Sequence, residues 1–302
     1  MTTVRFGPEH SGMLLALWNS AVPHDTMSAA LFHEKVFTDV AVDETLRIAS
    51  FEGAKALGFA VGCRRSTTAN AGSIKLFAVS ERARRSGVGS ALVNRIEAEL
   101  FAAGATKIRI GESPPNYLQP GVDRRYVQTM AFLEALGYVE FAQTYNMDVN
   151  LADADLDTAT EELRLHDIGF EISAASANSA DPLRRFIDSV FPAWRGEVDA
   201  ALANPAPSVY FCSRENTVVG FAALDGNNRG TGWFGPMGTA PEHRGLGIGE
   251  VLLKRALSDI RDRGHNTAII PWVGPVPFYE RTVRAYVSRT FARMEKSIGN
   301  AI

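Results

Sequence analysis

Cysteine is scarce in this sequence, which has two among its 302 residues, Cys63 and Cys212. They lie far apart in similar strand-like stretches, so we expect two buried small side chains and no disulfide or metal pair. No apolar run approaches the ~18 residues that span a membrane. The first residues, MTTVRFGPEH, lack the apolar core of a secretory signal. These absences predict a cytoplasmic protein with no membrane partner.

The sequence also lacks an excess of charge of either sign. It has 31 Lys and Arg residues against 34 Asp and Glu residues, and its net charge is −3 at pH 7. A nucleic-acid partner usually requires a strongly basic surface, so we expect none. The hydrophobic content of 46% and the charged content of 22% are typical of a globular protein. The length favours two domains.

A glycine-rich motif, R-x-x-G-x-G, occurs twice. Residues 84–89 read Arg-Arg-Ser-Gly-Val-Gly and residues 244–249 read Arg-Gly-Leu-Gly-Ile-Gly, 160 positions later. Each motif follows a strand-like segment and begins an amphipathic helix. The first amides of a helix have no partner within it, and glycines let a phosphate approach them closely. With an arginine beside them, these loops are predicted anion sites.

Matching segments on both sides of the two motifs indicate a duplicated domain. Upstream, Leu-Gly-Phe-Ala at 57–60 corresponds to Val-Gly-Phe-Ala at 219–222, and downstream Phe-Leu-Glu at 132–134 corresponds to Phe-Tyr-Glu at 278–280. Each copy is expected to run strand, two helices, three strands, helix, strand, helix, strand. We place the first copy at residues 1–150, an acidic linker at 151–168 and the second copy at 169–302.

Two other phosphate-binding motifs do not fit the glycine loops. A P-loop requires Lys followed by Ser or Thr after the glycines, and neither loop has them. A dinucleotide-binding loop requires a third glycine, and the two copies have Leu92 and Leu252 there. Glycines that serve only close packing of helix on strand are the remaining alternative, which the duplication makes less attractive.

The R-x-x-G-x-G loops and the element order resemble those of the GCN5-related N-acetyltransferases (GNAT). The resemblance implies an α/β (α+β) fold of two tandem domains, each a mixed, mostly antiparallel sheet flanked by helices. It implies acetyl-CoA as co-substrate, with no metal, and a pantetheine arm between two splayed strands. The residues expected at the coenzyme are Phe77, Val79, Arg84, Arg85, Gly87, Val88, Gly89 and Ser90 in the first copy, and Met237, Thr239, Arg244, Gly245, Gly247, Ile248, Gly249 and Glu250 in the second.

The same resemblance suggests the catalytic residues. Tyr279, in Pro-Phe-Tyr-Glu-Arg, matches the tyrosine that acts as the acid in many members, although Val283 stands where a glycine is usual. The first copy has Leu133 at that position, but an insertion before its helix brings Tyr126, expected two turns earlier on the same helical face. We therefore expect the second copy to be catalytic.

The general base and the acceptor stay open. Glu112 in the first copy, and Asp225 or His243 in the second, are possible bases, and a water chain would also suffice. The leading hypothesis is acetyl transfer to a primary amine of a small molecule, by a monomer or homodimer. The alternatives are a non-catalytic acyl-CoA sensor, a mycothiol-synthase-like enzyme and a protein acetyltransferase. Trp272 is expected in a pocket wall or in the core.

Overall fold

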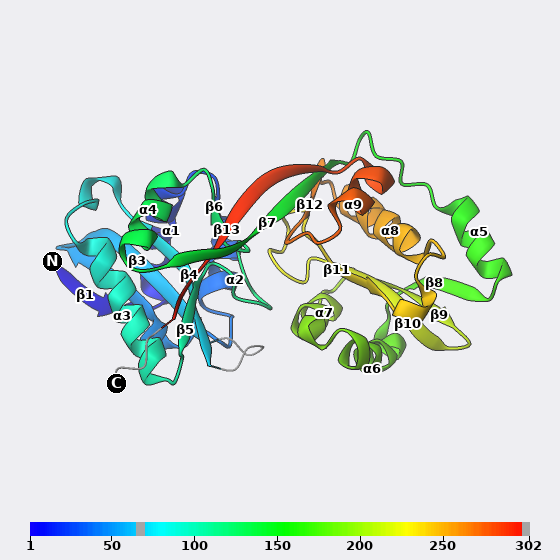
Figure 1. Cartoon of the computed structure of the whole chain (residues 1–302), viewed down its shortest axis with the longest axis horizontal. Coiled ribbons are helices and arrows are strands. Elements are labelled where there is room, and N and C mark those ends of the chain that lie inside the picture. Colours follow the sequence, from blue (N-terminus) through cyan, green and yellow to red (C-terminus); the bar gives the residue numbers. More distant parts are fainter. Residues whose placement is uncertain (65–69, 298–302) are drawn as a thin grey trace. The chain divides into compact units, whose positions relative to one another are not determined.

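The computed structural model describes residues 1–64 and 70–297. The chain divides into two compact units (Figure 1). The first unit holds Met1–Thr144 together with the chain from Phe291 onward, and the second unit holds Tyr145–Thr290. These units do not coincide with the boundaries expected at 150 and 168, because two long strands each contribute to both. They are β7 (Val139–Asn150) and β13 (Tyr286–Ser297).

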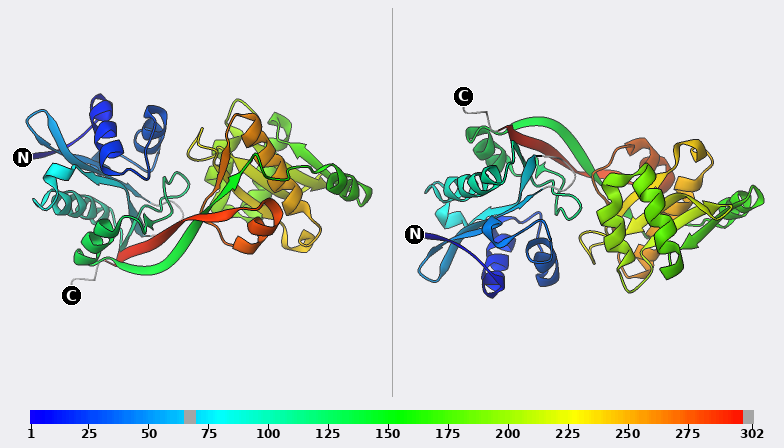
Figure 2. Two further views of the ribbon diagram at one scale, coloured as in Figure 1. Left: turned by 90° about the horizontal axis from the view of Figure 1, so that it is seen from above. Right: turned by 90° about the horizontal axis from the view of Figure 1, so that it is seen from below.

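The first unit is a sheet with helices on both faces (Figure 2). Its strands follow the order β1-β2-β3-β4-β5, antiparallel except for the parallel pair β4 and β5. One face packs α1 and α2 around Phe32 and Phe59, and the other packs α3 and α4 around Leu92 and Leu133. The elements are β1 (Thr2–Arg5), α1 (Ser11–Ala21), α2 (Ala29–Val36), β2 (Arg47–Glu52), β3 (Lys55–Arg64), β4 (Ala71–Val79), α3 (Val88–Ala102), β5 (Lys107–Ile110), β6 (Val122–Asp123) and α4 (Val127–Ala135).

The second unit repeats this plan with the sheet order β11-β10-β9-β8. Helix α8 covers one face of this sheet, and α6 and α7 cover the other (Figure 1). Helix α5 lies within the expected linker, yet its Leu165 is fully buried in the core beside α8. The elements are α5 (Ala159–Asp167), β8 (Phe170–Ala174), α6 (Ala180–Val190), α7 (Arg195–Leu202), β9 (Val209–Arg214), β10 (Thr217–Leu224), β11 (Phe234–Thr239), α8 (Ile248–Asp262), β12 (Thr267–Ile270) and α9 (Val276–Val283).

Each unit completes its sheet with a strand end that comes from the other copy. In the first unit Glu295–Ser297 of β13 pair with β5, and in the second unit Met147–Asn150 of β7 pair with β12. Ion pairs hold the end of β13: Glu295 binds Lys107 at 2.8 Å and Arg109 at 3.2 Å. The strands expected at 138–149 and 286–294 are therefore present, but their partners are exchanged.

Strand pairing is irregular in the strand that leads into each glycine loop. The pairing of β4 with β5 ends at Ile74 and Ile110, where β5 itself ends, and β4 continues beyond it to Val79. In the second unit β11 and β12 are joined only by a bridge between Trp233 and Ile269, as far as the described residues show. A bulge precedes each loop as well, at Lys75 in β4 and opposite Ala223 in β11. Bulges of this kind turn a strand locally and often adjoin functional sites.

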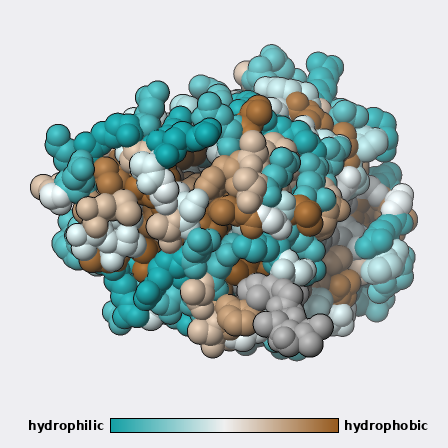
Figure 3. Space-filling model, turned by 60° about the vertical axis from the view of Figure 1, so that its left-hand side comes forward, coloured by the Kyte–Doolittle hydropathy of each residue, from teal (hydrophilic) through white to brown (hydrophobic). Residues whose placement is uncertain are grey.

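The surface and the thiols are those of an ordinary globular chain. On the face shown in Figure 3, hydrophobic side chains lie in small groups among hydrophilic ones. Across residues 1–64 and 70–297, we find no helix with the length and hydropathy to cross a membrane. Cys63 and Cys212 are both buried thiols, and burial raises the pKa of Cys212 to about 12.

Candidate functional site

Both glycine motifs form the same turn from a strand into a helix. In the second unit the chain leaves β11, makes one short 3-10 turn (Pro241–His243) and enters α8 after Gly247. Gly247 has φ 87°, and its counterpart Gly87, before α3, has φ 83°. This left-handed conformation is readily adopted only by glycine. The backbone geometry therefore requires glycine at this position of the motif, Gly87 in the first copy and Gly247 in the second.

The start of α8 presents backbone donors. The first amides that donate near it are those of Glu250 and Val251, both to the carbonyl of Gly247, at 3.1 and 3.2 Å. In the part of the chain that the structure describes, the amides of Ile248 and Gly249 have no acceptor. Side-chain capping is absent too at this N-terminus. Unsatisfied amides at the positive end of a helix dipole suit a phosphate.

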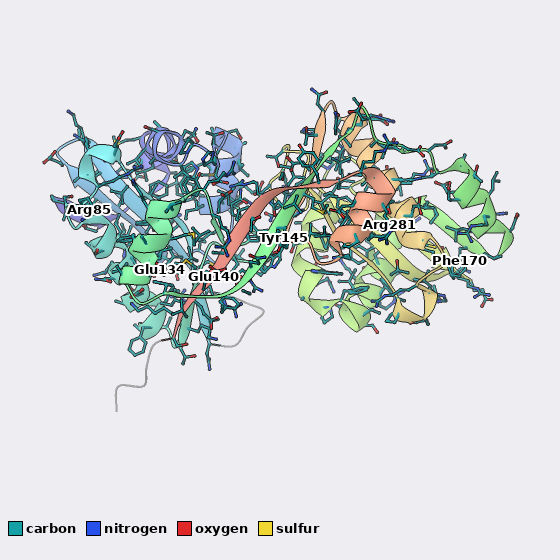
Figure 4. The ribbon with its side chains drawn as sticks, turned by 45° about the horizontal axis from the view of Figure 1, so that its top comes forward. Arg85, Glu134, Glu140, Tyr145, Phe170 and Arg281 are labelled. Carbon is teal, nitrogen blue, oxygen red and sulfur yellow. The ribbon has the colours of Figure 1, made fainter. Side chains whose placement is uncertain are left out.

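Arginines stand beside both turns. Arg84 and Arg85 are exposed on the first loop, where Figure 4 labels Arg85. Arg85 adopts φ 64°, whereas the matching Gly245 in the second loop has φ 80°. Arg244 donates from Nε to the carbonyl of Thr239 at 3.1 Å, which holds its side chain against the end of β11. Each helix start therefore has exposed arginine side chains close to its first turn.

The strand residues expected at the coenzyme lie against the first turn of each helix. A Cβ on Gly249 would lie 3.5 Å from Met237 Cε and 3.7 Å from Thr239 Oγ1. A Cβ on Gly89 would meet Phe132 and Phe77 at 3.2 and 3.4 Å.

The strand and the last helix bring different side chains to the two loops. Phe77 on β4 and Phe132 on α4 stack in parallel, with 5.5 Å between ring centres. Met237 and Phe278 occupy the matching positions, and Met237 is an unbranched, flexible side chain. Two stacked rings therefore lie beside the first loop, and a flexible methionine and one ring lie beside the second.

The remaining residues expected at the coenzyme differ in whether their side chains are exposed. Val88 and Ile248 are each 1% exposed and point into their cores, so they offer only their backbone. Glu250 forms an ion pair with Lys254 at 3.1 Å. Val79 and Ser90 are partly buried.

Tyr279 lies in α9, which Figure 4 marks at Arg281. Its side chain is 7% exposed and contacts the rings of Phe234 and Phe278 edge-on, with 6.5 and 5.0 Å between ring centres. Burial raises the pKa of Tyr279 to about 12, so the hydroxyl keeps its proton at neutral pH. Val283 stays helical, and the left-handed turn falls one residue later, on Arg284 with φ 54°.

Tyr126 does not lie on a helical face. Helix α4 begins at Val127, and Tyr126 precedes it in a turn closed by a hydrogen bond from its amide to the carbonyl of Asp123. Its hydroxyl donates to Asp25 at 2.8 Å and accepts from the amide of His24 at 3.0 Å. Tyr126 thus attaches the insertion to the connection between α1 and α2.

The possible bases are all engaged in contacts. Glu112 is 1% exposed and binds Arg109 and Arg293, each at 2.6 Å. Asp225 binds Arg263 at 2.9 Å. The ring of His243 packs edge-on against Phe170, which Figure 4 labels, with 5.5 Å between ring centres. Glu112 is therefore placed as the centre of an ion-pair cluster in the first unit.

The contacts of two residues in the second unit, Trp272 and Arg164, were not predicted. Trp272, just after β12, has φ 49°, and its amide donates to Asn146 of β7 at 3.1 Å. Arg164 of α5 donates to the carbonyl of Leu246. Both depend on contacts between segments distant in sequence, which the spacing of residues does not reveal. Within the described ranges, no group of three or more His, Cys, Asp or Glu side chains is arranged to hold a metal ion.

A family of known proteins matches this chain twice, once in each copy. The model of the acetyltransferase (GNAT) family matches residues 14–118 and again residues 174–287. Among curated proteins, no sequence matches this chain.

Solved structures share the fold over the whole chain. The glucosamine N-acetyltransferase region of a fungal multi-domain GH3 β-N-acetylglucosaminidase has a TM-score of 0.84 and 17% identity, covering 98% of this chain and 38% of its own. An N-acetyltransferase from Sphaerobacter thermophilus has a TM-score of 0.72 and 15% identity, covering 100% and 96%. A tandem GNAT protein from the clavulanic acid biosynthesis pathway has a TM-score of 0.69 and 13% identity, covering 100% and 99%. The chain belongs to the GNAT family as a tandem two-domain N-acetyltransferase.

Proposed function

We propose that this enzyme transfers an acetyl group from acetyl-CoA to a primary amine of a small molecule, and that the second unit carries the reaction. Acetyl transfer follows from the family, which uses acetyl-CoA as co-substrate. The observation that carries the coenzyme assignment is the pair of helix starts behind Gly87 and Gly247, each with a left-handed glycine and an arginine beside it.

The second unit fits the coenzyme in several respects. The amides of Ile248 and Gly249 and the guanidinium of Arg244 would hold the diphosphate, because oriented amides and a forked cation both favour phosphate oxygens. The divergence of β11 from β12 leaves the pantetheine arm a place between strands. When bound, the coenzyme supplies the acetyl group as a thioester, a form that a neutral amine can attack.

Tyr279 is the proposed proton donor. A tyrosine hydroxyl carries its proton over the neutral range, and Oη of Tyr279, with its pKa raised to about 12, does so too; in the proposed reaction it donates this proton to the departing sulfur. Its neighbours Phe234 and Phe278 exclude water from the ring without donating hydrogen bonds. We assign no side chain as general base, and solvent would take the amine proton.

A thiol-release assay with acetyl-CoA and a panel of amines tests this proposal. Glucosamine belongs in the panel because the structural relative with a TM-score of 0.84 is a glucosamine N-acetyltransferase. Tyr279→Phe should lower turnover by about a hundredfold or more, the usual range for a lost acid catalyst. The matched control is Tyr286→Phe, since Tyr286 is 56% exposed on β13.

The outcomes separate an enzyme from a sensor. Amine-dependent thiol release that Tyr279→Phe suppresses, with coenzyme affinity unchanged, supports the proposal. Coenzyme binding without release for any amine would favour a non-catalytic acyl-CoA sensor. Full turnover in Tyr279→Phe would remove Tyr279 from the mechanism.

A further inference from the structure

Helix α5 is an element of the second unit that brings one cation to the second loop. The Nη2 atom of Arg164 donates to the carbonyl of Leu246, and it lies 2.8 Å from where a Cβ on Gly247 would be. Arg164 is itself exposed. Its other N–H groups have no acceptor among the residues that the structure describes. The guanidinium is therefore held at the turn with donors still available to a ligand.

The helix that carries Arg164 is firmly attached to α8. Leu165 is fully buried, and Glu162 forms a two-pronged ion pair with Arg255 of α8. Lys254 of α8 also donates to the carbonyl of Asp157 at 3.3 Å. Because these contacts lie on both sides of Arg164 in the chain, the position of its side chain is set by packed structure.

The two loops reach the same charge by different routes. The first loop has two adjacent arginines, Arg84 and Arg85, and Arg85 adopts a left-handed φ of 64°. The second loop has glycine at the matching position 245, and so keeps only Arg244 in the motif. Arg164, which lies outside the motif, supplies a second cation at this loop. Two guanidinium groups beside one loop can bind different oxygens of a multiply charged anion.

We infer that Arg164 is a coenzyme-binding residue of the second unit, where its guanidinium binds a phosphate group of acetyl-CoA. This inference rests on the proposed coenzyme site. Arg164 takes the place that Arg85 holds in the first loop, and its bond to Leu246 orients it for the ligand. The role of α5 is then to complete the second site.

Calorimetric titration tests the role of Arg164 in a variant whose first loop no longer binds acetyl-CoA. The background variant is Arg84→Glu with Arg85→Gly, since glycine is what the second loop has at that position. In this background Arg164→Ala should weaken acetyl-CoA binding about tenfold, the loss expected for one charge-assisted contact. Arg164→Lys keeps the charge without the fork and should fall between. Arg261→Ala, an exposed arginine at the far end of α8, is the control.

Salt and ligand series separate a ligand role from a supporting one. The effect of Arg164→Ala should shrink between about 0.1 M and about 0.5 M NaCl, because salt screens exposed charges. A loss for acetyl-CoA and 3′-dephospho-acetyl-CoA alike assigns Arg164 to the diphosphate, and a loss for acetyl-CoA alone assigns it to the 3′-phosphate.

Two results would overturn the inference: unchanged affinity, or a loss that salt does not alter. If the background variant itself does not bind acetyl-CoA, the proposed second site fails, which is a different outcome.

Discussion

At the scale of single residues, Arg85 combines a charge with a backbone conformation that suits glycine. The left-handed conformation at φ 64° costs a non-glycine residue about 1 kcal/mol of folding free energy. Glycine avoids this strain but loses more backbone entropy on folding, which is a smaller cost here. Arg85→Gly should therefore raise the free energy of unfolding by up to ~1 kcal/mol and weaken coenzyme binding at the first loop. Urea denaturation and titration in an Arg244→Glu background measure the two effects. Lower stability would show that Arg85 is not strained.

Tyr279 provides a pH-dependent prediction. Its pKa is raised to about 12 in the fold from 10.0 in the unfolded chain. The unfolded state therefore loses its proton first, so the contribution of Tyr279 to stability is complete below pH 10 and is lost as pH rises through about 12.

The measurement for Tyr279 is urea denaturation at pH 9 and at stepwise higher pH, with the wild type and Tyr279→Phe side by side. The wild type should lose up to ~3 kcal/mol more than the variant over this range, because the pKa differs by about two between the folded and unfolded states and one pKa unit corresponds to ~1.4 kcal/mol. Parallel curves would mean that the hydroxyl is not desolvated.

Glu112 tests the difference between a base and a structural anion. Its carboxylate joins Arg109 and Arg293, so Glu112→Gln removes the buried negative charge that these two cations share, and Arg109 keeps its ion pair with Glu295. We expect a loss of ~2–4 kcal/mol in the free energy of unfolding and little change in turnover per folded molecule. Glu140→Gln is the control, since the Arg124–Glu140 pair is exposed. A large loss of turnover with unchanged stability would restore Glu112 as a base.

Single residues were predictable from the sequence where local geometry fixes them. The motif glycines identify Gly87 and Gly247, because the turn into a helix there requires a left-handed residue. Tyr126 was expected in a helix that starts one residue later, since apolar spacing does not locate the first turn. The contacts of Arg164 and Trp272 could not be predicted, because segments distant in sequence make them.

At the scale of elements, the exchange of strand ends is the main feature of the fold. Strand β5 of the first unit pairs with β4 on one side and with Glu295–Ser297 of β13 on the other. Ending the chain after Thr290 should therefore leave β5 at an open edge. Its amides should exchange faster with solvent, while those of β9 and β10 should keep their protection.

Hydrogen exchange followed by mass spectrometry measures this, with the full chain as reference. Unchanged protection of Lys107–Ile110 would contradict the assignment of β13 to the first unit. The sequence predicted a strand at 138–149 and another at 286–294, and both exist. Alternation along a strand says which face is buried and nothing about which strand lies beside it. The exchange, and with it the division into units, was therefore beyond the sequence.

At the scale of the whole molecule, duplication explains why one chain has two similar turns from a strand into a helix, at Gly87 and Gly247. The offset between the motifs predicted two copies, and the family match at 14–118 and 174–287 agrees with it. The copies have since diverged: Phe77 and Phe132 stack beside the first loop, whereas Met237 and Phe278 lie beside the second. Loop spacing alone could not show this difference, because it arises from residues on another strand and another helix.

The most direct test of the account is calorimetric titration of the intact chain with acetyl-CoA, repeated with Arg84→Glu and Arg85→Gly together, with Arg244→Glu, and with all three changes. We predict saturable binding by the wild type, a clear loss of heat in Arg244→Glu, and no binding when both loops are altered. Absence of saturable binding by the wild type at millimolar acetyl-CoA, or full binding by the variant with both loops altered, would contradict the assignment of the coenzyme to these loops.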